Sequence, residues 1–358
     1  MSSAMNIKSD PLIGYALLPI HWLDTPGQMP LLFMNMQLFQ YLALYLITAI
    51  GWPLLASAEP VGNPIEINEL IKSKDPYMGI QLMGSLSLKG NPALAELSGL
   101  AWDEDEQTLL AISDRGWLLH LLPIFENGNL IQADLQKIRV LKDRHGKPLR
   151  GSWRDSEGLT LENSENGVSG DTSLIISFER HNRIERYTLD GEWVKTEPLP
   201  KLLEQTSFQP KGNKGLEAVT LHPQLGIITG PEYPPKGTPH YLVNSAGIKW
   251  YFTPKEPNGA LVALEALPNG DLILLERAYT SIFAPWVISL TQIKMADLVP
   301  DNQVSSTLIA RFDSSEGWLT QNLEGLTRHQ GMHFFMVSDD GNKPWAQTQL
   351  IYFKLLQP

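Results

Sequence analysis

Cysteine is absent from this chain of 358 residues. Disulfide bonds are therefore excluded, and so are metal sites built on thiolate ligands. Hydrophobic residues make up 43% of the chain. A protein of this length forms a large enough core to be stable outside the cell without disulfides.

Basic residues are few relative to acidic ones. The chain has 28 Lys and Arg against 39 Asp and Glu, a formal net charge of −11. Nucleic acid is not an expected partner, because phosphate backbones require a basic surface. An acidic protein suits cation binding, although acidity is also an ordinary solubility feature.

The signatures of several common enzyme classes are missing. The Gly-x-Ser-x-Gly spacing is absent, so an acyl-serine mechanism has little support. The chain also has no His-Glu-x-x-His motif and no glycine-rich phosphate loop. A catalytic site, if there is one, has to be assembled from residues that lie far apart in the sequence.

Long apolar runs are scarce, and one lies near the N-terminus. Residues 39–55 are mostly apolar and lead into Ala56-Ser57-Ala58, a small-x-small cleavage signal. We expect residues 1–58 to be a signal peptide or leader, with the true start codon further downstream at Met29, Met34 or Met36 as an open alternative. The mature protein is then periplasmic or secreted from a bacterium, with no stable membrane span. The alternative is an uncleaved membrane anchor, for which the run is marginal in length.

A short phrase recurs along the rest of the chain: a small or acidic residue, then Gly or Ala, then an aliphatic residue. The copies are Ser98-Gly99-Leu100, Glu157-Gly158-Leu159, Glu217-Ala218-Val219, Glu265-Ala266-Leu267 and Glu324-Gly325-Leu326. Repeats separated by 40–50 residues or more are typical of β-propeller blades.

Each repeat phrase is followed by an apolar, strand-like run that ends in charged residues. These ends are Asp114-Arg115, Glu179-Arg180, a site near Glu232, Glu276-Arg277 and Asp339-Asp340. A hairpin brings the start of its first strand beside the end of its second. We therefore expect the acid of each phrase and the acid at the end of each run to lie at one edge of the fold, forming an acidic cup.

The repeats predict an all-β fold. Counting phrases gives a β-propeller of about five four-stranded blades, or six if an irregular stretch hides a copy. Residues 80–88 form an extra strand before the first phrase, and residues 350–355 complete a last repeat that is one strand short. Pairing these terminal strands in one blade would close the ring and remove an open sheet edge. The expected organisation is a linker over 59–75 and a propeller over 76–358.

Several of these segments resemble the phytase-like family, often labelled "esterase-like activity of phytase". The segments are Glu96-Leu97-Ser98-Gly99-Leu100, Ile112-Ser113-Asp114-Arg115-Gly116, Asp155-Ser156-Glu157-Gly158-Leu159, Ser177-Phe178-Glu179-Arg180, Gly215-Leu216-Glu217-Ala218 and Leu323-Glu324-Gly325-Leu326. The resemblance extends from about Met78 to Leu355 and implies an exported bacterial propeller that hydrolyses phosphate or carboxylic esters. The first copy departs from the pattern, because Ser98 replaces Glu. Glu96 lies two residues earlier, on the same face of a strand, and is expected to reach the cup.

The acidic cup predicts a divalent cation, with calcium as the first choice, because hard cations take several oxygen ligands. The expected metal ligands are Glu96, Asp114, Glu179, Glu265, Glu276, Glu324 and Asp339. Glu157 or Glu217 is expected to act as general base. Arg180 and Arg277 are expected to hold an anionic substrate in catalysis, with Lys214, Arg115 and His181 as further substrate-binding residues.

Three functions remain open. The first is a metal-dependent hydrolase of small anionic phosphate or other esters, the second is a non-catalytic propeller that binds a cation or ligand, and the third is a sugar-acid lactonase. A structural role is also open for each acid, because a Glu at the start of an inner strand can bond backbone amides of the next blade and only close the ring.

Overall fold

The computed structural model describes residues 58–204, 215–279 and 285–356. The chain divides into two units, 1–55 and 56–358. The expected signal peptide lies almost wholly in residues 1–57, outside the described residues, and the account below concerns the second unit. Within the described ranges, no helix is long and apolar enough to cross a membrane.

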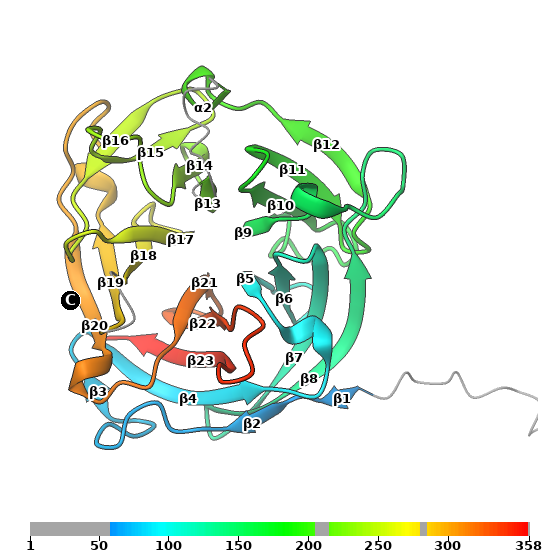
Figure 1. Ribbon diagram of the computed structural model, residues 1–358, viewed down its shortest axis with the longest axis vertical. Coiled ribbons are helices and arrows are strands. Elements are labelled where there is room, and N and C mark those ends of the chain that lie inside the picture. Colours follow the sequence, from blue (N-terminus) through cyan, green and yellow to red (C-terminus); the bar gives the residue numbers. More distant parts are fainter. Residues whose placement is uncertain (1–57, 205–214, 280–284, 357–358) are drawn as a thin grey trace, which may run out of the picture. The chain divides into compact units, whose positions relative to one another are not determined.

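The described chain is all-β and forms the predicted propeller of five blades (Figure 1). Each blade is an antiparallel sheet of four strands, which are given below in order from the axis outward. Blade one comprises β5 (Leu97–Asp103), β6 (Thr108–Ser113), β7 (Trp117–Glu126) and β8 (Asn129–Val140). Blade two comprises β9 (Ser156–Glu162), β10 (Ser173–Phe178), β11 (Arg183–Thr188) and β12 (Trp193–Glu197).

The next two blades follow in chain order. Blade three comprises β13 (Leu216–His222), β14 (Gly226–Pro231), β15 (His240–Asn244) and β16 (Lys249–Phe252). Blade four comprises β17 (Ala260–Ala266), β18 (Leu272–Ala278), β19 (Val287–Ile293) and β20 (Thr307–Asp313). The helical elements are short: α2 (Lys201–Glu204) and the 3-10 turns Pro92–Leu94, Gly151–Trp153, Met295–Asp297 and Ser314–Glu316.

Blade five closes the ring, and the predicted pairing of the two ends of the propeller is confirmed. Its strands are β21 (Asn322–Arg328), β22 (His333–Asp339), β23 (Thr348–Leu355) and β4 (Ile80–Leu88), which precedes blade one in sequence. Short edge strands extend the sheets: β1 (Glu59–Pro60) pairs with β8, while β2 (Gly62–Pro64) and β3 (Pro76–Tyr77) pair with β4. The segment 59–75, expected as a linker, thus contributes strands to blades one and five.

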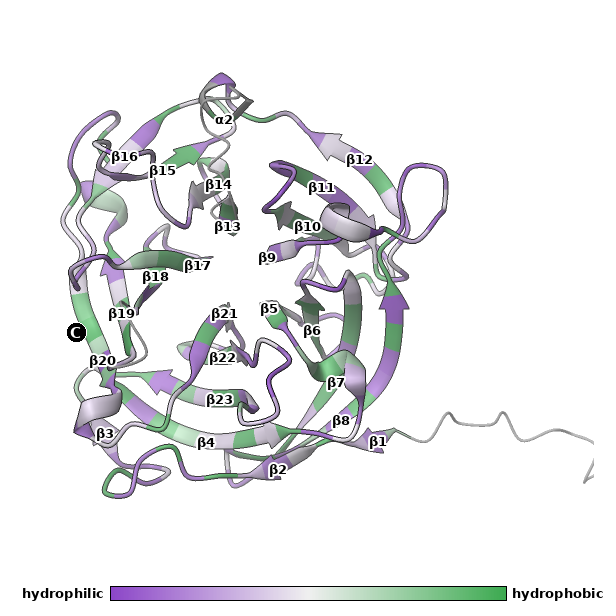
Figure 2. Ribbon diagram, in the orientation of Figure 1, coloured by the Kyte–Doolittle hydropathy of each residue, from purple (hydrophilic) through white to green (hydrophobic). Residues whose placement is uncertain are grey.

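The hydrophobic core is divided among the interfaces between neighbouring blades. Leu100 and Leu109 of blade one, for example, share a buried cluster with Phe335 and Val337 of blade five. The second strand β6 is buried at every position, and the other second strands are buried except at one or two residues, whereas the outer strand β12 is mostly exposed. Figure 2 shows the same gradient, with more hydrophilic stretches along outer strands such as β8 and β12.

The inner strands β5, β9, β13, β17 and β21 surround the axis (Figure 1) and approach one another closely. A Cβ added at Gly158 would lie 2.6 Å from the backbone oxygen of Glu217, and one at Gly99 would lie 2.7 Å from that of Glu157. The glycine of the repeat phrase is therefore needed for the close approach of neighbouring blades.

Candidate functional site

The inner strand of each blade has a register shift near its start, typical of a β-bulge. A bulge re-aims the side chain at that point and is often found beside binding sites. The residues at this position are Ser98, Glu157, Glu217, Val262 and Glu324. On the second strand, the residue that precedes each bulge pairs with a partner, and the residue after that partner is Asp114, Glu179, Glu232, Arg277 or Asp339.

Together these positions form a group of carboxylates at one end of the axis, which we call the acidic mouth. It comprises Asp114, Asp155, Glu157, Glu179, Glu217, Glu232, Glu324 and Asp339. Each of these acids lies in the electrostatic field of at least one other member. The expected convergence of distant acids is therefore present for Asp114, Glu157, Glu179, Glu217, Glu324 and Asp339.

Blade four departs from the other blades, and two predicted placements are wrong for this reason. The bulge position of this blade is Val262, so the phrase that begins at Glu265 is three residues out of phase. The residue equivalent to the terminal acids is Arg277, not Glu276. Glu276 instead accepts hydrogen bonds from the Lys255 backbone N–H (2.7 Å) and the Thr291 hydroxyl (2.9 Å) within its own blade.

Glu265 lies at the opposite end of the inner strands, where it lines a cavity of about 120 Å³. Side chains at this end bond the next blade: Thr160 accepts from Leu221 N–H, Thr220 from Ala266 N–H and Thr327 from Trp102 N–H, at 3.0–3.3 Å. Glu265 accepts a hydrogen bond from the backbone of Arg328 in the same way. We call the set Thr160, Thr220, Glu265 and Thr327 the closing end. The ring-closing role considered for the phrase acids thus applies to Glu265.

Three carboxylates of the acidic mouth differ from Glu265, because their hydrogen-bonding capacity is unused. The carboxylates of Glu157 and Glu217 make no hydrogen bond or ion pair with any described residue, although both residues are buried. Asp114 has a buried oxygen, Oδ1, that likewise lacks a partner among the described residues. Buried polar groups without partners are rare in folded proteins and call for an explanation, such as an ion.

The unpartnered acids belong to two compact groups. Oxygens of Asp114, Asp155 and Glu157 lie within 4.8 Å of one another, as do oxygens of Glu179, Glu217 and Glu232. Two oxygens that ligate one Ca²⁺ at about 2.4 Å are at most about 4.8 Å apart. Both groups therefore have the spacing that a shared hard cation requires.

Arg277 supplies a buried positive charge on the other side of the mouth. Its guanidinium pairs with Glu232 at 2.5 Å and with Glu324, and it donates to the Asn322 side-chain oxygen at 2.6 Å. The Asn322 amide in turn donates to Glu324 and Asp339. Blade four thus compensates Glu232 of blade three and Glu324 of blade five, while Asp114 and Glu157 have no such ion pair among the described residues.

Crowding raises the pKa of the acids in the mouth. Burial, followed by repulsion from Asp114 and Glu217, raises the pKa of Glu157 well above its usual range. Burial and the neighbouring carboxylates raise the pKa of Glu179 and that of Glu324 each to about 7. Like charges held together disfavour ionisation unless a cation compensates them. A proton or a cation would therefore relieve the repulsion within the mouth.

Arginines lie at the rim of the mouth. Arg180 pairs with Asp155 through Nε at 2.6 Å, and 47% of its side chain is exposed. Arg115 pairs with Glu96 at 2.8 Å, which leaves Glu96 at the rim and partly neutralised. Both guanidinium groups are accessible to an anionic molecule that enters the mouth.

His181 lies on the same side, on the turn after β10. Its Nε2 is 2.8 Å from the Ser152 hydroxyl, and its ring stacks on Trp153. Burial and the neighbouring Arg183 lower the pKa of His181. Lys214, also expected to bind substrate, lies outside the described residues.

Sequence reasoning assigned no metal-binding, catalytic or substrate-binding role to three residues of the site. Asp155 and Glu232 complete the two carboxylate groups, and Asn322 links Arg277 to Glu324 and Asp339. Glu232 had a usable signal, since it follows an apolar strand as the other terminal acids do. Asp155 and Asn322 lie just before or at the start of inner strands, outside the repeat phrase, and carried no signal of their own.

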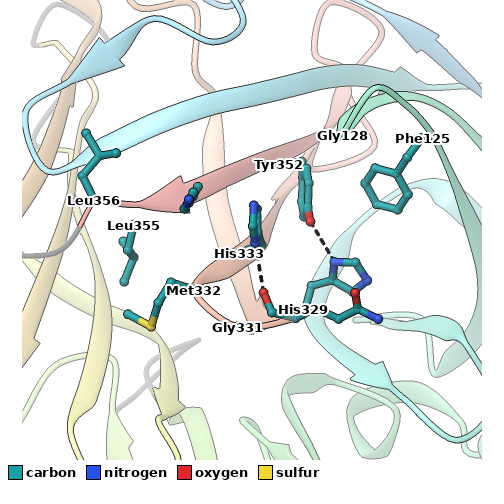
Figure 3. Close-up of a pocket in the computed structure, with 11 residues that line it drawn as sticks. Phe125, Gly128, His329, Gly331, Met332, His333, Tyr352, Leu355 and Leu356 are labelled. Carbon is teal, nitrogen blue, oxygen red and sulfur yellow. Dashed lines mark hydrogen bonds between the residues drawn. The ribbon is translucent and has the colours of Figure 1, made fainter.

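A second cavity, of about 840 Å³, is of a different chemical kind (Figure 3). It is lined by Phe125, His329, His333 and Tyr352, and no carboxylate is among the described residues that line it. His329 Nδ1 lies 2.8 Å from the Tyr352 hydroxyl, and burial lowers the pKa of His329 to about 4. These rings pack blades five and one together, and the charge-rich site remains the acidic mouth.

Comparisons with solved structures find matches at low similarity. The chain is 9% identical to the WD40 domain of Neurospora crassa Pan2, covering 80% of this chain and 98% of that one with a TM-score of 0.37. It is 11% identical to a gluconolactonase of Xanthomonas campestris, covering 83% and 97% with a TM-score of 0.38. A tail fibre of Staphylococcus aureus phage P68 gives 11% identity, 78% and 53% coverage and a TM-score of 0.42.

No curated protein matches the chain. The phytase-like family model, described as esterase-like activity of phytase, matches residues 92–342. This match covers all five inner strands and every member of the acidic mouth. The chain therefore belongs to the phytase-like family.

Proposed function

We propose that this protein hydrolyses ester bonds of small anionic substrates, phosphate esters in the first place, at a divalent-cation site in the acidic mouth. The observation that carries the proposal is that the carboxylates of Glu157 and Glu217 and the buried Oδ1 of Asp114 have no partner among the described residues, although oxygens of other acids lie within 4.8 Å. Buried charges of one sign are costly unless an ion compensates them, so this arrangement is retained for a purpose other than stability.

The group formed by Asp114, Asp155 and Glu157 is the preferred cation site. The other group is already partly compensated, because Glu232 pairs with Arg277 and Glu179 accepts the Gly215 N–H at 3.2 Å. All donors are carboxylate oxygens, which suit Ca²⁺ or Mg²⁺ rather than softer metals. A cation held there would polarise a phosphoryl or acyl oxygen and lower the pKa of a bound water.

The chain's own groups have separate tasks in this proposal. Glu217, which lies in the field of Glu179 and Glu232 and has a raised pKa, acts as general base toward the attacking water. Arg180, exposed at the rim, positions the anionic group of the substrate. Arg277 fixes Glu232 and Glu324 and keeps the far wall of the mouth from repelling an anion.

We further propose that the protein works outside the cytoplasm, with residues 1–58 as a signal peptide. Support comes from the apolar run before Ala56-Ser57-Ala58. Free calcium is abundant in extracellular spaces, where weak carboxylate sites are occupied. The N-terminal residue of the protein recovered from culture medium or periplasm would test this: Glu59 at the N-terminus supports export, and an intact leader contradicts it.

The hydrolase proposal is tested by activity on p-nitrophenyl phosphate and p-nitrophenyl acetate, before and after chelation. Glu157→Gln removes one buried charge without changing volume and is expected to lower turnover at least about 100-fold. Glu265→Gln is the matched control, since burial raises the pKa of Glu265 as well, to about 8, but Glu265 lies at the closing end. Activity that survives chelation, or equal losses in both variants, would contradict the proposal.

A further inference from the structure

A pocket of about 210 Å³ adjoins the acidic mouth on the side of blade five. It shares Asn322 and Asp339 with the mouth, and it is otherwise lined by loop residues that include Trp286, Lys343 and Trp345. Its volume is below the range of about 300–1,000 Å³ that is typical of pockets for drug-sized ligands. The pocket therefore has room for one small ring next to the ester-cleaving site.

Two tryptophans give the pocket its apolar surface. Trp345 is 78% exposed, which is unusual for the largest apolar side chain of a soluble domain. Trp286 stacks on Tyr279, with ring centroids 4.3 Å apart and planes 19° apart, so its orientation is fixed. An exposed aromatic face beside a fixed one offers a flat ring a surface on which to stack.

A buried hydroxyl without a partner lines the same pocket. Thr320 is 5% exposed, and its Oγ1 has no hydrogen-bond partner among the described residues. Neighbouring polar groups are occupied: Gln321 Oε1 accepts from Gln347 N–H, and the Asn322 amide binds Glu324 and Asp339. An unsatisfied hydroxyl at the wall of a cavity is a ready donor and acceptor for a ligand hydroxyl.

The charge of the pocket selects against polyanions. Asp339 and Asp340 lie at its wall, and Lys343 is the one basic side chain among the described residues that line it. The Asp340 carboxylate already accepts from Glu96 N–H and Asn342 N–H, so its position is fixed. A ring that carries several phosphates would meet this negative wall, whereas a ring that carries hydroxyl groups would not.

We propose that this pocket binds the uncharged, hydroxylated ring of the substrate, such as a hexose, while the ester group of that substrate lies in the acidic mouth. The placement of the ester group in the acidic mouth rests on the proposed function. Binding of the ring in the pocket does not, and it can be tested without turnover. The substrate class is then a sugar monoester, in preference to a polyphosphorylated ring.

The ring site is tested with methyl β-glucoside as the probe, on chelated Glu157→Gln protein that cannot turn over. Saturable binding, followed by tryptophan fluorescence and by saturation-transfer NMR, is expected. Trp345→Ala should weaken binding about tenfold. Trp153→Ala is the matched control, since Trp153 is 53% exposed but lies in the turn before blade two and does not line the pocket. The Trp153→Ala variant should bind the glucoside as tightly as its parent protein. No saturable binding, or equal binding by the two tryptophan variants, would overturn the ring site.

Thr320→Val offers an independent check, because valine has nearly the shape of threonine. The loss of the hydroxyl should weaken glucoside binding with no fall in the thermal unfolding midpoint, since the hydroxyl has no partner in the protein. Myo-inositol hexakisphosphate should not displace the glucoside, and displacement would overturn the charge argument. If the glucoside binds as expected and glucose 6-phosphate is nevertheless not hydrolysed by the metal-loaded wild-type protein, the ring site stands and the proposed hydrolase function fails.

Discussion

The two ends of the inner strands differ in how their polar side chains are bonded. At the closing end, Thr160, Thr220 and Thr327 each accept a backbone N–H from the next blade, and Glu265 does the same. Three residues earlier along the same strands, about 10 Å away, the bulge carries Glu157, Glu217 and Glu324. Polar side chains at one end hold blades together, and at the other end two of the acids bond nothing in the described protein.

This difference separates structural acids from candidate functional ones. A carboxylate that is bonded to a neighbouring backbone, as Glu265 is, needs no ligand to account for it. Glu157 and Glu217 are buried too, yet neither carboxylate forms a hydrogen bond or ion pair with a described residue, and burial together with repulsion from other acids raises the pKa of both. The comparison therefore favours, as the candidate functional end, the one where charges are left uncompensated by the described residues.

The largest expected effect comes from removing the buried cation of the mouth. Arg277→Met leaves Glu232 and Glu324 without their partner and is expected to cost about 3–5 kcal/mol of unfolding free energy. Arg180→Met is the control, because Arg180 is half exposed and its loss should cost at most about 1 kcal/mol. Urea denaturation measures both, and equal costs would show that the mouth does not depend on Arg277 for charge compensation.

The next effect concerns pH. Burial raises the pKa of Glu179 and that of Glu324 to about 7, above the usual value of 4.5, so the folded state takes up protons that the unfolded state does not. The stability that these protons provide is fully present below pH 4.5 and is lost as the pH rises through 7. The thermal unfolding temperature of the chelated protein, measured by scanning calorimetry, should therefore decrease as the pH is raised from 5 to 8.

Calcium should reverse this fall at the upper end of the range. At about 100 times its Kd, a bound cation adds about 2.7 kcal/mol of stability, and the gain should shrink toward pH 5 as protons compete. The double variant Glu179→Gln with Glu324→Gln should flatten the pH profile of the chelated protein. A profile as steep as that of the wild type would show that other groups set it.

The smallest expected effect is at the closing end. Thr220→Val removes the hydroxyl that accepts Ala266 N–H and should cost about 1 kcal/mol, with calcium binding unchanged. Titration calorimetry and urea denaturation on the same sample separate the two quantities. A change in calcium affinity would mean that the two ends are coupled through the inner strands.

The sequence was sufficient for the fold and for part of the site. Alternating strands and turns with a repeated phrase predicted five blades closed by residues 80–88, and the bulge acids Glu157, Glu217 and Glu324 were found in the phrase itself. These residues were recoverable because the backbone requirement for a small residue at Gly158 or Gly325 marks the position in the sequence.

Blade four shows why the rest was not recoverable. The phrase at Glu265 has the right residues at the wrong register, and only strand pairing reveals that Val262 is at the bulge. A shift of one residue along a strand moves a side chain to the other face, which is why Arg277 and not Glu276 reaches the mouth. The positions of Asp155 and Thr320 are set by how loops of different blades pack together. The residue pattern of a single strand does not predict that packing.

Calcium binding at pH 7.5 by chelated protein, measured by isothermal titration calorimetry, tests the central claim most directly. The wild type and Glu265→Gln should bind Ca²⁺ saturably with the same stoichiometry, and Glu157→Gln should lose the site. No binding by the wild type, or undiminished binding by Glu157→Gln, would show that the uncompensated acids of the mouth are not a cation site.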